Sequence, residues 1–121
     1  MKHDAPPPID LRLEWHVLAH IHAGYLKADA VDRGWFTAER KLTFARLKHG
    51  TLAEWELATF DLLPALSDRD ITEQVGRLRE LARRRHIILA VSGVDAGLRA
   101  DAMTADEACE LLAQAQEAAH A

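Results

Sequence analysis

The sequence has a single cysteine and no long run of hydrophobic residues. Cys109 alone cannot form an intramolecular disulfide, so the chain has to be stabilised by a buried core, and a reducing compartment fits it best. No window contains the eighteen or more consecutive apolar residues of a membrane span, and the N-terminus lacks the apolar segment of a secretion signal. We therefore expect a cytoplasmic protein that is not embedded in a membrane.

The common catalytic motifs are also missing from the sequence. It has no Gly-rich phosphate loop, no Gly-x-Ser-x-Gly elbow and no Cys-x-x-Cys pair. Cys109 lies in an alanine-rich stretch that reads as a helix, without an obvious charged neighbour to activate its thiol, and is interpreted as a buried structural cysteine. No catalytic residue set and no cofactor are predicted, and the sequence favours a protein that is not an enzyme.

Length and composition indicate one folded domain. A chain of 121 residues with 49% hydrophobic and 28% charged residues is close to the average soluble protein and can bury a core without a structural metal. Three consecutive prolines before Ile9 prevent the first residues from starting a helix. We expect a proline-rich tail over residues 1–8 and a single helical domain over residues 9–121.

Hydrophobic spacing and capping signals predict a succession of helices. The first is expected to start after Asp10 and to continue to about Arg33, with Gly34 as its stop. The others are expected from 38 to about 48 with Thr37 as cap and Gly50 as stop, from a capping box at Thr51 and Glu54 to Pro64, from Ser67 or Asp68 to about Val91, and from a capping box at Thr104 and Glu107 onward.

The run Ile87-Ile88-Leu89-Ala90-Val91 is ambiguous, because periodicity does not separate a buried helix end from a short strand. A helix is preferred, since the sequence offers no second strand to pair with this one. Residues 92–103 contain two glycines and are predicted to form a loop. The fold class is therefore all-α, a compact bundle of four or five helices, with a short irregular or strand-like segment near 87–91 as the alternative.

Two histidines suggest a metal site. His16 and His20 are four residues apart, so on a helix they share one face and both imidazoles could bind one ion. A complete site would need a further ligand, such as His49 or His86. The alternatives are that both rings pack at the edge of the core, which is favoured, or that they sense pH.

An arginine-rich segment suggests a second kind of site. Arg77 and Arg84 are seven residues apart on one side of the predicted helix, Arg83 and Arg85 flank that line, and Lys41 and Lys48 could extend it. Residues 87–121, in contrast, hold one arginine and six acids. The basic residues could bind nucleic acid or an acidic protein surface, or form an ordinary solvated helix end, which is favoured.

Trp35 and Phe36 follow Gly34 and form either a corner of the core, which is favoured, or an exposed anchor for a partner. With separate acidic and basic segments and no catalytic set, the sequence favours a small helical interaction module. Such a protein would act as a homo-oligomer or as an adaptor in a larger assembly. Protein partners or self-association are expected, a nucleic-acid-contacting subunit is the first alternative, and a metal-binding protein is the second.

Overall fold

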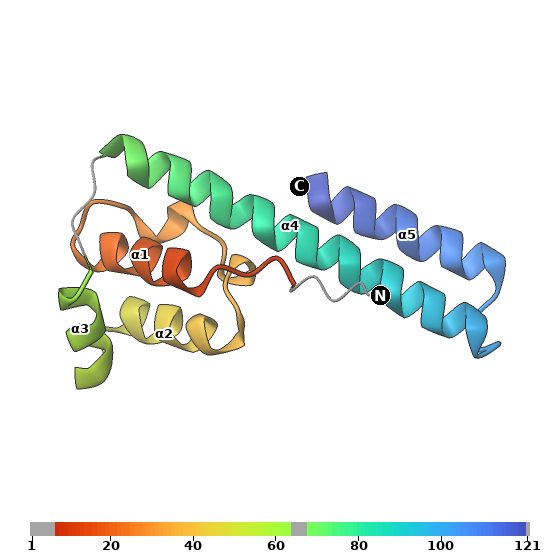
Figure 1. Ribbon diagram of the computed structural model, residues 1–121, viewed down its shortest axis with the longest axis horizontal. Coiled ribbons are helices and arrows are strands. Elements are labelled where there is room, and N and C mark those ends of the chain that lie inside the picture. Colours follow the sequence, from red (N-terminus) through yellow and green to blue (C-terminus); the bar gives the residue numbers. More distant parts are fainter. Residues whose placement is uncertain (1–6, 64–67, 121) are drawn as a thin grey trace, which may run out of the picture. The chain divides into compact units, whose positions relative to one another are not determined.

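The structure, a computed structural model, describes residues 7–63 and 68–120. In this part of the chain there are five α-helices and two short 3-10 helices, and no strand (Figure 1). The all-α fold class predicted from the sequence is confirmed. The elements are α1 (Leu11–His22), η1 (Ala28–Ala30), η2 (Arg33–Trp35), α2 (Ala38–His49), α3 (Glu54–Asp61), α4 (Asp68–Arg99) and α5 (Ala105–His120).

The chain divides into two compact units, which we describe separately. One unit comprises residues 9–82 and contains α1, α2, α3 and the first half of α4. The other comprises residues 83–121 together with residues 1–8, of which the structure describes Pro7, Pro8 and residues 83–120. The sequence predicts one domain over residues 9–121 and a tail over residues 1–8. Residues 1–6 of that tail lie outside the part of the chain that the structure describes.

Helix α1 is shorter than predicted. Asp10 caps it as expected, since its carboxylate accepts a hydrogen bond of 3.1 Å from the Leu13 backbone N–H. The helix ends at His22 rather than near Arg33, because Gly24 adopts a left-handed φ of 86° and turns the chain. The apolar spacing that suggested a longer helix belongs to the two 3-10 turns that follow.

The turn from α2 to α3 is organised by Glu56. Helix α2 ends as predicted at Gly50, which has φ 70°. The Glu56 carboxylate then accepts hydrogen bonds from the Arg46 side chain at 2.8 and 2.7 Å and from the Ala53 backbone N–H at 2.9 Å. The capping box predicted for Thr51 and Glu54 is therefore wrong, because α3 starts three residues later than Thr51 and Glu56 supplies the capping carboxylate.

The core of the unit formed by residues 9–82 includes aliphatic side chains of α1 and α4 and three phenylalanine rings. Its buried members are Leu13, Val17, Leu18, Val31, Phe36, Phe44, Phe60, Leu78 and Leu81. Glu14 is buried beside them, and its Oε1 accepts hydrogen bonds from the Thr37 backbone N–H at 2.7 Å and from the Thr37 hydroxyl at 2.9 Å. Helix α1 thus holds the start of α2 through a carboxylate as well as through apolar contacts.

Helix α4 is longer than predicted. Residues 87–91 are helical, so the strand-like alternative is wrong, and the helix continues through Gly93 and Gly97 to Arg99 where a loop was expected. Helix propensity penalises each glycine by only about 1 kcal/mol, which neighbouring turns offset. Pro64 and Ser67, the predicted end of α3 and one predicted cap of α4, lie outside the described residues.

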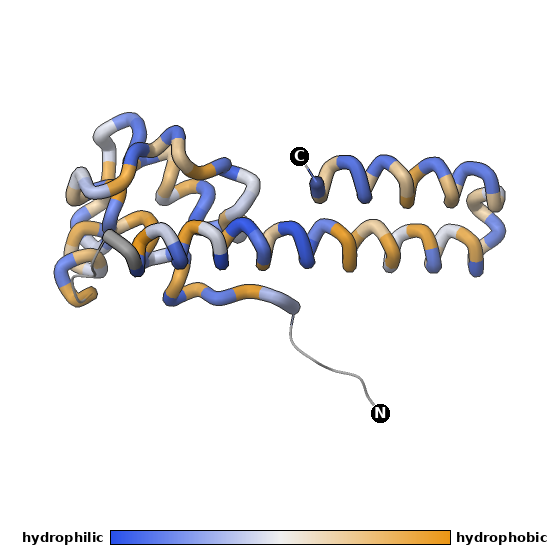
Figure 2. The backbone as a smooth tube through the Cα atoms, turned by 90° about the horizontal axis from the view of Figure 1, so that it is seen from above, coloured by the Kyte–Doolittle hydropathy of each residue, from blue (hydrophilic) through white to orange (hydrophobic). Residues whose placement is uncertain are grey.

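Helix α5 starts with the capping box that the sequence predicted. The Thr104 hydroxyl accepts a hydrogen bond of 3.1 Å from the Glu107 backbone N–H. In return, the Glu107 carboxylate accepts a hydrogen bond of 3.0 Å from the Thr104 backbone N–H. In both views α5 runs back beside the second half of α4 (Figures 1 and 2). We call residues 83–99 of α4 together with α5 the hairpin.

Replacing Glu56 by glutamine is expected to lower the free energy of unfolding by about 2 kcal/mol at neutral pH, because charge-assisted hydrogen bonds in a buried position are lost. The Arg46 side chain holds the pKa of Glu56 at about 2, against an ordinary value of 4.5. Its contribution is therefore complete above pH ~4.5 and is lost as the pH falls toward 2. Urea denaturation across this pH range measures the effect.

The matched control for this variant is Glu54→Gln, which changes an exposed carboxylate on the same helix. The control should unfold within about 0.5 kcal/mol of the wild type. Equal effects of the two substitutions would contradict the role given to Glu56.

A pair of glycine substitutions tests the unexpected extension of α4. An alanine Cβ at Gly93 meets nothing within 4 Å, whereas at Gly97 it would lie 2.9 Å from Met103 Cε and 3.3 Å from Met103 Cβ. We expect Gly93→Ala to stabilise the helix by about 0.5–1 kcal/mol and Gly97→Ala to lose that gain. Thermal unfolding followed by circular dichroism measures both, and a loop over residues 92–99 would show no gain from Gly93→Ala.

Candidate functional site

The structure places His16 and His20 on one side of α1, as their spacing predicted. Both are buried, with 6% and 4% of their surfaces exposed, and their ring centroids are 6.4 Å apart. Burial lowers the pKa of both imidazoles below 6.5, with the nearby Arg12 guanidinium adding to the effect at His16. At His20 the nearby Gln74 side chain works in the opposite direction and raises the pKa. Both rings therefore favour the neutral form at neutral pH.

The two histidines do not gather the further ligands that a metal centre needs. Among the described residues, no group of three or more histidine, cysteine, aspartate or glutamate side chains is arranged to hold a metal ion. His49 and His86, which the sequence analysis had considered as additional ligands, are exposed on α2 and α4. The arrangement resembles two core-edge histidines more than it resembles half of a zinc site.

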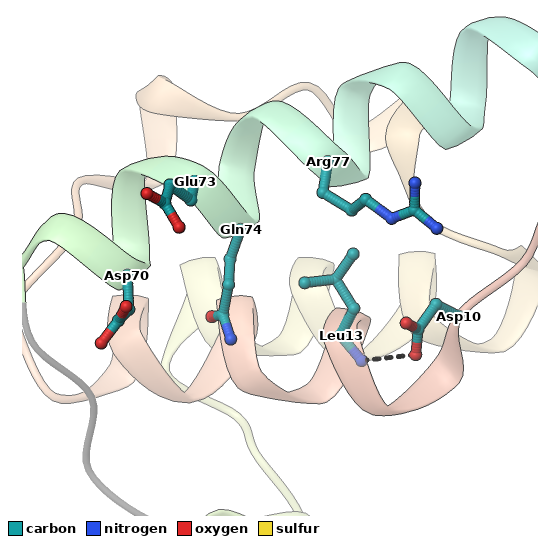
Figure 3. A pocket seen from close by; sticks show the side chains of 6 residues that line it. All are labelled: Asp10, Leu13, Asp70, Glu73, Gln74 and Arg77. Carbon is teal, nitrogen blue, oxygen red and sulfur yellow. Dashed lines mark hydrogen bonds between the residues drawn. The ribbon is translucent and has the colours of Figure 1, made fainter.

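A polar depression lies between the start of α1 and the first half of α4, within the unit of residues 9–82 (Figure 3). It has a volume of about 500 Å³ and is lined by Asp10, Leu13, Asp70, Glu73, Gln74 and Arg77. Asp10 is already engaged in capping α1. The lining mixes three carboxylates with one guanidinium and contains no nucleophile paired with a base, so it does not form a catalytic set.

The basic candidates are divided between the two units. Arg77, Lys41 and Lys48 belong to residues 9–82, where Arg77 lines the depression and the Lys48 ammonium lies 5.3 Å from the centre of the Phe44 ring. Arg83, Arg84 and Arg85 belong to the hairpin unit. Because three consecutive residues on a helix point in three directions about 100° apart, these arginines do not form a single stripe.

One of these arginines has a local structural contact. The Arg85 guanidinium donates a hydrogen bond of 2.9 Å to the Pro8 carbonyl. Part of the predicted tail is therefore held against α4 within the hairpin unit, and Arg85 is less available for a phosphate than the sequence suggested.

Trp35 and Phe36 both contribute to the core of the unit formed by residues 9–82. Phe36 is only 1% exposed, and its ring lies 5.2 Å from that of Phe44. Trp35 is partly buried and packs against the same core. The favoured interpretation of the two residues as a corner of the core agrees with these positions.

The hairpin leaves many of its large apolar side chains substantially exposed. Among its described residues the buried hydrophobic side chains are Val94, Ala108 and Ala119. Seven large apolar side chains keep between 39% and 69% of their surfaces exposed, namely Ile87, Ile88, Leu89, Val91, Leu98, Leu111 and Leu112. Two helices packed only on each other bury one narrow seam, which leaves such side chains in contact with water.

A small groove marks the end of this seam. It has a volume of about 180 Å³ and lies between α4 and α5, where Arg83, Ile87 and Val91 face Leu112, Ala119 and His120. Cys109 is exposed on α5, so its interpretation as a buried structural residue is wrong.

Sequence reasoning missed this apolar surface. The run from Ile87 to Val91 was interpreted as buried because five consecutive apolar residues are typical of the interior. A helix rotates by about 100° per residue, so five in a row cannot all face one neighbour. Figure 2 shows this hydrophobic run directly after the hydrophilic arginine segment of α4. Counting the helices available to cover each side of α4 would have shown that some of these apolar side chains stay exposed.

Comparisons with known proteins assign no function to these sites. No protein-family model matches the chain, and neither curated proteins nor solved structures give a match. Of the described helices, none combines the length and the apolar character that crossing a bilayer requires.

Stability is expected to fall as the pH decreases below about 6.5, because the unfolded chain then binds protons that the buried His16 and His20 resist. The contribution of the neutral rings is complete above the unfolded pKa and is lost as the pH falls toward the lowered folded values. Chemical denaturation at pH 8 and pH 5.5 measures the difference.

The double variant His16→Gln/His20→Gln should flatten this pH dependence. His49→Gln, which changes an exposed histidine on α2, should leave it in place. A wild-type protein equally stable at both pH values would show that the two buried rings do not titrate as proposed.

Proposed function

We propose that this chain is a helical interaction module that binds a protein partner through the hairpin. The observation that carries the proposal is the imbalance between three buried hydrophobic residues and seven large apolar side chains left substantially exposed. Several large exposed apolar side chains on one short segment of structure are typical of protein interaction sites. The sequence also favours a helical interaction module, and the hairpin is the surface that would bind the partner.

Covering these side chains would contribute a substantial part of the free energy that specific binding requires. Complete burial of a large aliphatic side chain contributes about 1.5–3 kcal/mol, so covering the exposed half contributes on the order of 1 kcal/mol. Seven such side chains give several kcal/mol before the cost of association is subtracted. Micromolar affinity corresponds to a net free energy of about 8 kcal/mol, so the apolar surface and polar contacts of the partner have to supply the remainder and the cost of association.

The second candidate, a nucleic-acid-contacting subunit, has less support. Arg83, Arg84 and Arg85 are consecutive and therefore spread around the helix, and Arg85 donates a hydrogen bond to Pro8. A surface that follows a phosphate backbone needs its cations on one side. We therefore favour a protein partner.

Photo-crosslinking in the cell tests the proposed surface directly. A benzophenone-bearing amino acid placed at Leu89 or Leu111, which are 69% and 42% exposed, is expected to give discrete protein adducts. The same residue placed at Lys27 or Asp29, which are exposed positions of the other unit, is the matched control. Mass spectrometry identifies the adduct.

Adducts at the hairpin positions and not at the control positions would support the proposal. The same diffuse pattern at all four positions, or no adduct at Leu89 and Leu111, would contradict it. Each substituted protein should first show the wild-type helix content by circular dichroism, so that a misfolded variant is not scored.

A further inference from the structure

The charges of the hairpin are separated along its length. Residues 83–94 contain three arginines, one histidine and no acid, whereas residues 95–110 contain five acids and one arginine. We call residues 83–86 the arginine end and residues 95–110 the acidic end. Residues 111–120 add one acid, Glu117, and His120.

The packing of the hairpin places these two segments at its opposite ends. Arg83 lines the same groove as Ala119 and His120, so the arginine end lies beside the C-terminal end of α5. At the other end, a Cβ added at Gly97 would meet the Met103 side chain, so residues 97 and 103 lie close together where the chain turns from α4 into α5. The hairpin is thus basic where it is open and acidic where it turns.

We infer that the partner of the hairpin is a second copy of this chain, bound antiparallel. In that arrangement a two-fold axis perpendicular to the helices brings the arginine end of each copy near the acidic end of the other. The arginines are spread around their helix, so the attraction acts between the net charges of the two ends, and it occurs twice. The same axis brings one face of each hairpin together, covers those exposed apolar side chains that lie on that face, and forms a four-helix bundle. This inference rests on the proposed function and names its partner.

The parallel arrangement of two copies is excluded by the same charges. It would place three arginines against three arginines and five carboxylates against five carboxylates. Like charges at an interface oppose association and act as a selection against the wrong geometry. The charge distribution therefore fixes the direction of pairing, while the apolar surface supplies the affinity.

Charge reversal in the full-length, untagged protein tests the inference. Variant A carries Arg83→Glu and Arg84→Glu, which makes both ends acidic. Variant B carries Asp106→Lys and Glu110→Lys, which removes the net negative charge of the acidic end and leaves the cap formed by Glu107 intact. Lys27→Glu with Arg33→Glu changes the net charge of the other unit by the same amount as variant A and is the control.

We expect the wild type and the control to form dimers in light scattering and native mass spectrometry at low salt, and to dissociate more readily at about 0.5 M salt. Variants A and B alone should self-associate at least about tenfold more weakly than the wild type. An equimolar mixture of A and B should recover dimers, and native mass spectrometry should identify them as A–B heterodimers. A variant combining all four substitutions should also self-associate weakly, because its acidic end carries no net charge that could attract the other end.

A wild type that stays monomeric at low salt, or a mixture of A and B that forms no heterodimer, would overturn the inference. Photo-crosslinks from Leu89 to a different protein would then leave the proposed function standing with another partner, whereas the absence of any adduct would remove both. If variant A or B loses its helix content, two milder, neutralising pairs of substitutions replace them, Arg83→Gln/Arg84→Gln and Asp106→Asn/Glu110→Gln. The test is then whether each of them makes dimerisation less sensitive to salt than it is in the wild type. A protein whose dimerisation neither neutralising pair alters does not use these charges.

Discussion

The buried carboxylate of Glu56 is the interaction on which the unit of residues 9–82 depends most. It is fully removed from water, and a charge in that position is tolerated only when its oxygens are occupied. Arg46 from α2 and the Ala53 backbone N–H at the start of α3 occupy them, so one group fixes the turn between two helices. Glu14 has a similar role at the start of α2, where its carboxylate accepts a hydrogen bond from the Thr37 backbone N–H. Two carboxylates thus position three short helices whose lengths alone would leave them marginal.

The two units differ in how completely they bury their own apolar side chains. Residues 9–82 surround a continuous core that contains three phenylalanine rings, and Arg40 is placed 4.2 Å from the centre of the Trp15 ring at its edge. In the hairpin, the described hydrophobic residues that are buried are a valine and two alanines. A core of that size does not offset the conformational entropy lost by ordering some forty residues. The hairpin therefore has the composition of one half of a larger core.

Local signals in the sequence predicted structure well, and signals that depend on neighbours did not. Thr104 and Glu107 satisfy each other within four residues, and Gly50 stops α2 by its own backbone geometry, so both were predictable. The capping role of Glu56 was missed because it depends on Arg46 from the preceding helix. The extension of α4 past Gly93 was missed because glycine weighs against a helix, and the tertiary packing that overrides this cost cannot be read from the local sequence. For the candidate sites, spacing correctly placed His16 and His20 on one face, but the exposure of Leu89 and Cys109 follows from which surfaces have neighbours.

The continuity of α4 gives binding a consequence for folding. Its first half is stabilised by Leu78 and Leu81, which are buried in the core, while its second half carries the exposed run that begins at Ile87. A helix that continues beyond its core contacts frays unless something covers it. A partner that binds only the folded hairpin therefore stabilises it by mass action. When that partner is a second copy, the order of residues 83–120 depends on protein concentration, and assembly and completion of the fold are one equilibrium.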